Sequence, residues 1–493
     1  MKNRLFALIL CGLLTAQVAA CGGSSSTGTD ATASSGGADT TTSGETTGET
    51  SGVPAGTDLD GETINIWYTT TATSVAETFV DLNPEQTGDM LDDAIYNMNV
   101  AIEDKLNVKL NYVNSNTPTS DTGSVVRTQL LADDTSFDLY HVVQWNASVL
   151  AAEGLYLNVA DAPYISFDKP WWDSGYMKEM TIGENKMYAL VGDYAVDRTR
   201  CLNCIYYNKE MYNDFYKDPD GLYEEVLNKK WTWDRLREIC AAVYSDLNND
   251  GVMDTEDRLG MVHNDYNNID GFWYGAGAIA TERDKKDVPQ VVLNSEHCVD
   301  VAQSLLELVF ESEGILNTGA EYTQDVENRT KFENGKYMFL PGFFYTSEAM
   351  REMKADFGIV PFPLYDENQD GYKSIVHDIM RFMTVPYNCQ KFESVCAVLE
   401  EMAFLGYRDV LPDYYNVLMK NKYARDEASA TMIDIIRDNC AVDIAYIYGF
   451  NKLGTLSRVM VQQKANWAST NAEYYPAGQV EIDKLVDNFT EVE

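Results

Sequence analysis

The sequence predicts an α/β fold with two lobes, and three observations support this prediction. Between residues 62 and 143, short apolar segments flank a stretch with apolar residues at helical spacing. Strands that alternate with amphipathic helices form a layered structure with a largely parallel sheet. The same style of segment returns between residues 295 and 405. The chain from residue 61 onward is too long for one hydrophobic core, so we expect two lobes, each with a sheet flanked by helices.

The first expected elements run in the order strand, helix, strand, strand. Apolar residues recur at a period of two over residues 64–68 and again over residues 108–112, which predicts two strands. Residues 138–143 are almost continuously apolar and predict a buried strand. Residues 91–106 predict a helix with one apolar face. That face comprises Leu91, Ala94, Ile95, Met98, Ile102 and Leu106.

Three later segments continue the pattern. Ser295 is expected to cap a helix, because its hydroxyl can accept a hydrogen bond from an unpaired backbone N–H. Residues 357–360 predict a strand that Pro361 ends, and residues 393–405 predict another helix. The absence of a fixed-period repeat argues against a solenoid or a propeller. The apolar stripe after Ser295 comprises Cys298, Val301, Ala302, Leu305, Leu306 and Val309.

The first twenty residues are expected to be an export signal. A short basic start precedes an apolar run over residues 5–14, which is too short to cross a bilayer. The segment Val18-Ala19-Ala20-Cys21 resembles the bacterial lipobox, whose cysteine receives acyl chains such as palmitate and becomes the mature N-terminus. The resemblance implies a signal peptide over residues 1–20 and stable membrane anchoring through lipidated Cys21. Ordinary secretion with an incidental cysteine is the alternative.

Residues 21–60 are expected to form a flexible, lipid-anchored linker. They are rich in Gly, Ser and Thr and carry too little apolar surface to offset the entropy of ordering them. No later stretch has the roughly 18 consecutive apolar residues of a membrane-spanning helix. A long linker after a lipidated cysteine suits the extracellular face of a Gram-positive cell, where a protein must stand off through the wall.

Charge and cysteine content narrow the class of protein. The net charge of −40 argues against binding to nucleic acid or to anionic lipid and fits an extracellular domain. The cysteines are too sparse for a scaffold held by disulfides. Cys201 and Cys204 have C-x-x-C spacing, but they lie in an expected strand, where positions three apart point to opposite faces. We therefore expect buried thiols there.

The sequence contains no recognisable catalytic motif. The patterns G-x-S-x-G, H-E-x-x-H and G-x-x-x-x-G-K-[S/T] do not occur. His377 and Asp378 are adjacent, but no serine or cysteine context makes them part of a triad. We therefore expect a protein that is not an enzyme and has no organic cofactor. A glycosidase with paired carboxylates and a surface adhesin without a small ligand stay open as alternatives.

Five segments, in order, resemble the extracellular solute-binding proteins of ABC importers. Each motif is weak alone, and their order and rough spacing over residues 62–410 give the resemblance its weight. The segment that begins at residue 185 has Asn and Val where the family usually has Gly and Pro. After residues 231–234, Arg235 stands where the family usually has an acid. Residues 185–190, 205–210, 231–234, 332–336 and 357–361 resemble the family's G-K-x-Y-A-L-P, Y-N-K-D/E, T-W-D-E-L, F-x-N-G-K and Y-G-x-x-P segments, respectively.

The resemblance implies a maltose-binding-protein-like fold of class II, and a monomer that delivers a solute to ABC permease subunits. The solute would bind in a cleft between the lobes, where ligands also collect in α/β folds because strands end there. The chain would cross between the lobes near residues 192–197, 364–374 and 408–414. Lobe I would comprise residues 61–192 and 372–410, and lobe II residues 197–368 and 412–493.

Aromatic and acidic residues near these crossovers are the candidate ligand-binding residues. Sugar rings present an apolar face to an aromatic plane and hydroxyls to carboxylates and amides. We therefore expect a carbohydrate, with a peptide or another polar solute as the alternative. Any one of these rings could equally belong to the core, so their convergence is what favours a binding site. The candidates are Trp145, Asn146, Asp193, Tyr194, Asp270, Trp273, Phe343 and Tyr345.

Residues 246–257 predict a calcium-binding loop with a structural role. Oxygen-bearing side chains recur through the loop, and Gly251 allows the tight bend that such loops need. Apolar residues at helical spacing precede the loop, and an expected strand follows it, so it is at most half of an EF-hand. A solvated acidic turn is the alternative. The expected ligands are Asp246, Asn248, Asp250, the backbone carbonyl of Val252, Asp254 and Asp257.

Overall fold

The computed structural model describes residues 49–72, 79–183, 185–319, 322–418 and 427–491. The predicted signal peptide, Cys21 and most of the predicted linker lie outside these residues. The chain from Thr46 to Glu493 forms one compact unit. Within the described residues, every helix is too short or too polar to cross a membrane.

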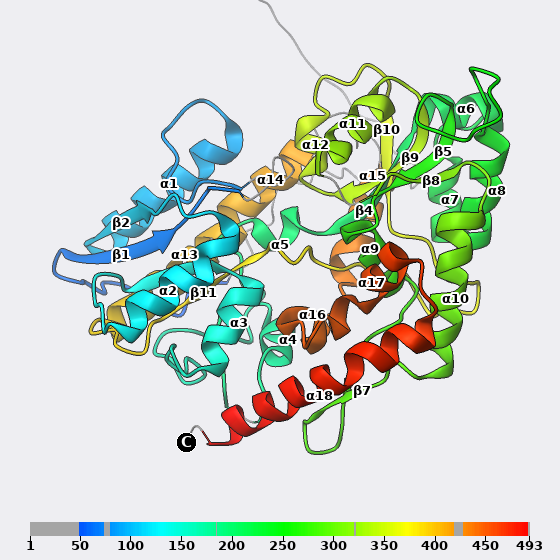
Figure 1. The fold of residues 1–493 in the computed structure, drawn as a ribbon. Coiled ribbons are helices and arrows are strands. Elements are labelled where there is room, and N and C mark those ends of the chain that lie inside the picture. Colours follow the sequence, from blue (N-terminus) through cyan, green and yellow to red (C-terminus); the bar gives the residue numbers. More distant parts are fainter. Residues whose placement is uncertain (1–48, 73–78, 184, 320–321, 419–426, 492–493) are drawn as a thin grey trace, which may run out of the picture. The chain divides into compact units, whose positions relative to one another are not determined.

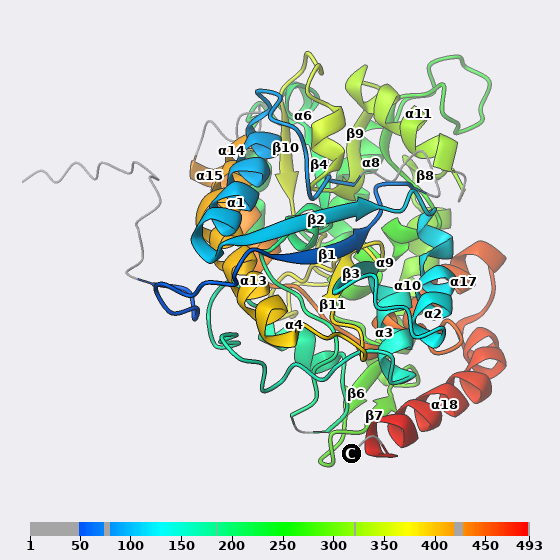
Figure 2. The same cartoon turned by 90° about the vertical axis from the view of Figure 1, so that its left-hand side faces the viewer.

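The first sheet, sheet I, contains four strands in the order β2-β1-β3-β11. The strands are β1 (Glu62–Tyr68), β2 (Val108–Asn114), β3 (Leu139–Val143) and β11 (Arg381–Thr384). β1 runs parallel to both β2 and β3, whereas β11 runs antiparallel to β3. Figure 2 shows β1 and β2 side by side with α1 (Met90–Leu106) at one face. The predicted strands of the first half are confirmed.

The helix between β1 and β2 forms where the apolar spacing predicts it. Asp89 caps α1, because its carboxylate accepts a hydrogen bond from the backbone N–H of Leu91. The helix ends at Asn107, which adopts the left-handed conformation with φ of 47°. All six predicted apolar residues of the helix are buried, and this face packs against α13 (Phe392–Leu405) and α14 (Leu411–Leu418).

The second sheet, sheet II, contains five strands in the order β8-β5-β9-β4-β10. β5 runs parallel to β8 and β9, and β4 runs antiparallel to β9 and β10. Both sheets thus place three parallel strands beside one antiparallel strand, and in sheet II β10 lies beyond it. The strands are β4 (Asn203–Asn208), β5 (Leu259–His263), β8 (Ile315–Asn317), β9 (Tyr337–Phe343) and β10 (Phe357–Val360).

Helices cover both sheets, and a small hairpin of β6 (Thr281–Arg283) and β7 (Pro289–Val291) stands apart from them. Figure 1 shows α13 and α14 as one continuous rod, joined by the π-helical turn η2 (Gly406–Val410). The remaining helices are η1 (Thr119–Asp121), α2 (Thr122–Leu131), α3 (Gln144–Ala152), α4 (Ser174–Glu179), α5 (Asp197–Arg200), α6 (Lys209–Tyr216), α7 (Gly221–Leu227), α8 (Trp233–Val243), α9 (Asn267–Gly275), α10 (Glu296–Glu311), α11 (Tyr322–Glu333), α12 (Thr346–Ala349), α15 (Glu427–Asp438), α16 (Ile444–Tyr448), η4 (Leu453–Thr455), α17 (Leu456–Gln463) and α18 (Trp467–Glu491).

The later sequence predictions are also confirmed, with three corrections. Ser295 caps α10 by accepting from the backbone N–H of Cys298, and Leu308 is buried where Leu306 was expected. The family segment that residues 185–190 resemble is a strand, but here these residues form no regular strand, and only Leu190 makes a bridge, to Met383. Cys201 lies just before β4 instead of within it, although it and Cys204 are buried free thiols as predicted.

The folded chain begins before residue 61, within the predicted linker. The backbone N–H of Gly52 donates to Glu400 Oε1 at 2.8 Å, and the Ser51 hydroxyl hydrogen-bonds to Glu401. Both glutamates are fully buried on α13, and buried carboxylates require such partners. Val53 is buried beside them. The end of the linker is therefore fixed to the half of the molecule that contains sheet I.

The C-terminal helices contact elements around both sheets. α17 packs on α9, and α16 packs on α3. Near the end of α18, the Asn488 amide donates to the Ala152 carbonyl of α3 at 2.9 Å. The segment predicted for lobe II therefore also touches elements predicted for lobe I. The predicted lobe boundaries and crossovers stay predictions.

Candidate functional site

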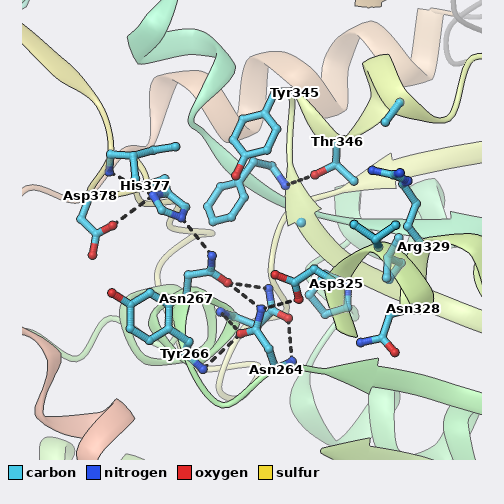
Figure 3. Close-up of a pocket in the computed structure, with 18 of the residues that line it drawn as sticks. Asn264, Tyr266, Asn267, Asp325, Asn328, Arg329, Tyr345, Thr346, His377 and Asp378 are labelled. Carbon is cyan, nitrogen blue, oxygen red and sulfur yellow. Dashed lines mark hydrogen bonds and ion pairs between the residues drawn. The ribbon is translucent and has the colours of Figure 1, made fainter. Parts of the chain in front are cut away.

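A cavity of about 270 Å³ lies where strands of sheet II end. Its walls come from the residues after β5, the start of α9, one face of α11, the end of β9, and α12 (Figure 3). The connection from β10 to β11 adds residues 377–379. Thr119, Ser120 and Trp145 come from the sheet I half. Ligands collect at such carboxyl ends because side chains from several loops converge there.

Three rings form an aromatic wall of this cavity. Phe343 and Tyr345 stack with their ring centroids 5.3 Å apart and an interplanar angle of 18°. The His377 ring meets Phe343 edge-on at 4.4 Å. Burial raises the pKa of the Tyr345 phenol well above its usual value, so this hydroxyl stays protonated at neutral pH. The wall offers a flat apolar surface with a hydroxyl group.

Asn264 organises the polar side of the cavity. Its amide nitrogen donates to Asp325 Oδ1 at 3.0 Å and to Asn267 Oδ1 at 2.9 Å. Its side-chain oxygen accepts from the backbone N–H of Tyr266 and of Asn268, both at 3.1 Å, which fixes the turn from β5 into α9. Burial raises the pKa of Asp325, although Asn264 and His377 oppose the shift.

His377 and Asp378 form a second polar group, held from outside the cavity. Asp378 Oδ1 lies 3.0 Å from His377 Nδ1, and Asp378 Oδ2 accepts from Arg458 at 2.9 Å. Arg458 also binds the buried carboxylate of Asp270. Burial alone would raise the pKa of Asp378, but Arg458 and His377 hold it well below its usual value. Asp378 is therefore ionised, with its charge largely neutralised.

The structure brings three of the predicted ligand-binding residues together at the cavity. Trp145 is half-buried at the start of α3 and lines the cavity with Phe343 and Tyr345. Asn146, its neighbour, lies outside the lining, because its amide donates to the Thr122 hydroxyl at 2.8 Å. The signal in the sequence for Trp145 and Asn146 was their position after an expected strand, whereas Phe343 and Tyr345 were indicated by the family resemblance. Whether these residues bind a solute stays a prediction.

The other predicted ligand-binding residues lie outside the lining: Tyr194, Asp270 and Trp273 are buried, and Asp193 is partly exposed. The Tyr194 hydroxyl donates to the Leu190 carbonyl at 2.7 Å, and burial raises the pKa of neighbouring Asp193 to about 7. Asp270 is bound by Arg458, as described above. Trp273 is 2% exposed, with its ring 4.8 Å from that of Trp467. The partners of Asp270 and Trp273 come from distant parts of the chain, so the sequence did not reveal them.

Sequence reasoning missed most of the polar lining. Asn264 directly follows the carboxyl end of β5, so the rule that ligands collect at strand ends could have identified it. His377 and Asp378 were noticed only as a poor catalytic pair. The lining on α11 gave no signal, because its polar residues resemble those of any solvated helix. These α11 residues are Asp325, Val326, Asn328 and Arg329.

The predicted calcium loop has the expected flanking elements, α8 and β5. A bridge between Ser245 and Arg258 closes its base. Asp246 accepts from the Gly251 backbone N–H at 2.9 Å, and Asp257 accepts from that of Leu247 at 3.0 Å. These bonds shape a tight acidic turn. Among the described residues, no three His, Cys, Asp or Glu side chains gather closely enough to hold a metal ion, so calcium binding stays a prediction.

A search with the sequence finds no matching family model and no matching curated protein. Solved structures do match. An extracellular solute-binding protein from Staphylococcus aureus in complex with maltose is 15% identical, covering 86% of this chain and 98% of that chain, with a TM-score of 0.56. The maltose/maltodextrin-binding domain MalE from Bdellovibrio bacteriovorus, bound to maltotriose, is 13% identical, covering 85% and 100%, with a TM-score of 0.55.

A third similar structure is an ABC transporter solute-binding protein from Thermotoga lettingae bound with α-D-tagatose. It is 13% identical and covers 86% of this chain and 100% of that chain, with a TM-score of 0.54. At these identities the likeness establishes the fold alone. The chain therefore has the two-lobed, maltose-binding-protein-like α/β fold that its sequence segments implied.

Proposed function

We propose that this chain is the solute-binding lipoprotein of an ABC importer and that it captures a carbohydrate in the cavity. One observation supports this most directly: the stacked pair of Phe343 and Tyr345 lies beside a group of amides and carboxylates. A sugar ring needs both, because its faces are apolar and its edge carries hydroxyls. The three similar structures named above were solved with maltose, maltotriose and α-D-tagatose, respectively.

The solute would be delivered to membrane permease subunits. Binding between elements of the two halves would favour a closed form of the protein, which the permease could recognise. Export and lipidation at Cys21 would hold this monomer at the extracellular face of the membrane. The chain would then act without chemistry of its own and would contact the membrane only through its lipid.

Calorimetry on the exported protein carrying Cys21→Ala tests the carbohydrate. Glucose, galactose, maltose, maltotriose and α-D-tagatose would be titrated beside trialanine. We expect at least one sugar to bind with a micromolar or lower Kd and trialanine not to bind. Binding of trialanine but of no sugar would contradict the proposal. Release of reducing sugar from maltotriose would instead show a glycosidase.

Fractionation tests the anchor. The unchanged protein should sediment with the membranes, whereas Cys21→Ala should appear in the culture medium, because the lipid is the proposed attachment. Equal membrane retention of both proteins would show that Cys21 is not the anchor.

A further inference from the structure

One face of α11 presents two opposite charges to the cavity. Asp325, Asn328 and Arg329 are spaced three and four residues apart, so they share one side of the helix. All three line the cavity, and Figure 3 shows Asp325 beside Asn264 with Arg329 farther along the same wall. Asp325 and Arg329 are not joined by any ion pair found among the described residues.

Two polar atoms on this face lack a hydrogen-bond partner among the residues that the structure describes. Arg329 Nε is buried without a hydrogen bond, and its nearest carboxylate, that of Glu333, is 3.9 Å away. Asn328 is 3% exposed; its amide donates to the Thr318 hydroxyl, but its Oδ1 has no partner. Buried polar atoms are normally satisfied, so these atoms point to a bound polar group.

The remaining charge in the lining is already neutralised. Arg458 pairs with Asp378 from behind the cavity wall. Among the described residues, by contrast, Asp325 accepts a hydrogen bond only from the neutral amide of Asn264. A solute in the cavity therefore meets one carboxylate and one guanidinium that are not paired with each other.

We propose that α11 selects a neutral sugar and excludes acidic and amino sugars. This inference rests on the proposed function and specifies its substrate class. A hydroxyl both donates and accepts, so hydroxyls of one sugar can donate to Asp325 and accept from Arg329. A uronate or an amino sugar carries a single charge that one of these two residues attracts and the other repels, so the cost of removing that charge from water is not compensated. The stacked rings beside them favour a sugar over a free amino acid, which could also match both charges.

The test compares neutral sugars with their charged counterparts on the exported Cys21→Ala protein. Glucose, glucuronate and glucosamine form one series, and galactose, galacturonate and galactosamine form another. Where the neutral member binds, we expect it to bind at least about tenfold more tightly than either charged member. Equal or tighter binding of a charged member would overturn the inference, and so would tight binding of alanine or glutamate.

Two variants, each of which removes one charge, identify the helix as the source of this selection. Asp325→Asn should weaken binding of the neutral sugar about tenfold. It should also lower the ratio of its affinity to that of the uronate, because the charge that repels the uronate is gone. Arg329→Gln should likewise lower the ratio of the affinity for the neutral sugar to that for the amino sugar. Glu327→Gln, on the same helix but outside the lining and paired with Lys331 instead of Arg329, should change none of these ratios.

The outcomes separate this inference from the proposed function. One outcome is that sugars bind and Tyr345→Ala weakens their binding, but the α11 variants leave every ratio of neutral to charged sugar affinity unchanged. The inference is then wrong and the proposed function stands. If no neutral sugar binds in either series or in the wider sugar panel, both are wrong. Melting temperatures of all variants show whether a loss of binding reflects unfolding.

Discussion

The two halves of the molecule contribute unequally to the cavity. Among the described residues, the half built on sheet II supplies the aromatic stack, the Asn264 group and the face of α11, whereas the sheet I half supplies only Thr119, Ser120 and Trp145. The two sheets nevertheless share the arrangement of three parallel strands beside an antiparallel one. Similar sheets therefore do not imply similar roles: the sheet II half should determine which solute binds, and the sheet I half should cover it.

Each half also contains a buried arginine network, and only one of them reaches the cavity. In the sheet I half, Arg381 donates to Asp197 at 2.9 Å, with His141 3.3 Å from the same carboxylate. In the sheet II half, Arg458 binds Asp270 and Asp378. Asp378 lines the cavity, whereas the members of the first network do not. The two networks therefore allow a matched comparison of how a buried arginine affects stability and sugar binding.

The largest effect is expected from removing these arginines. Arg458→Gln and Arg381→Gln should each cost about 3–5 kcal/mol of stability, because each leaves a buried carboxylate without its partner. Only Arg458→Gln should also weaken sugar binding, since Asp378 would lose its fixed position and neutralised charge. Denaturant titration and calorimetry at a temperature where both variants are folded make the comparison. Equal loss of affinity in both would contradict the difference between the halves.

The next effect compares one aromatic residue from each half. Tyr345→Ala should weaken sugar binding by on the order of 2 kcal/mol, about thirtyfold, because it removes half of the stacked pair. Trp145→Ala should cost about 1 kcal/mol, roughly fivefold, if the sheet I half mainly covers the solute.

Melting temperatures distinguish lost contacts from lost folding in these variants. If Trp145 belongs to the core, its removal should lower the melting temperature and leave the affinity of the folded fraction unchanged. A larger loss of affinity for Trp145→Ala than for Tyr345→Ala would reverse the assigned roles of the halves.

The sequence predicted the local structure of both halves well. The period of two in β1 and the apolar face of α1 are local signals. Ser295 predicts the start of α10, because a cap acts within one turn of its helix. A strand end also indicated Trp145, whereas the family resemblance indicated Phe343 and Tyr345. What could not be predicted depends on distant partners. Trp273 is an aromatic residue near an acid, and only its packing against Trp467 shows that it is core.

The predicted calcium loop should stabilise the sheet II half alone, because it leads directly into β5. At a calcium concentration ten times Kd, binding should add about 1.4 kcal/mol to the free energy of unfolding. Chelation should therefore lower the melting temperature, and Asp250→Ala should abolish the difference by deleting a central ligand. The control is Asp366→Ala, in an exposed turn of another loop. A melting temperature that ignores calcium after exhaustive dialysis would show that the loop is only an acidic turn.

The smallest effect concerns Asp193, the predicted ligand residue near the first crossover. Burial raises its pKa to about 7, and the nearby Arg198 opposes this shift while Asp173 adds to it. An unfolded chain releases this proton near pH 4. Between about pH 4 and pH 7 the unfolded chain therefore loses a proton that the folded protein retains. Stability should fall over this range, and above about pH 7 the penalty is complete.

Asp193→Asn should remove that penalty. Because the side chain is partly exposed, we expect a gain of only about 1 kcal/mol at pH 8 and almost none at pH 4. Sugar affinity should not change, since Asp193 does not line the cavity. Denaturant titrations at the two pH values and calorimetry at pH 8 check both statements. A drop in affinity without a change in stability would return Asp193 to the binding site and give the crossover a direct part in holding the solute.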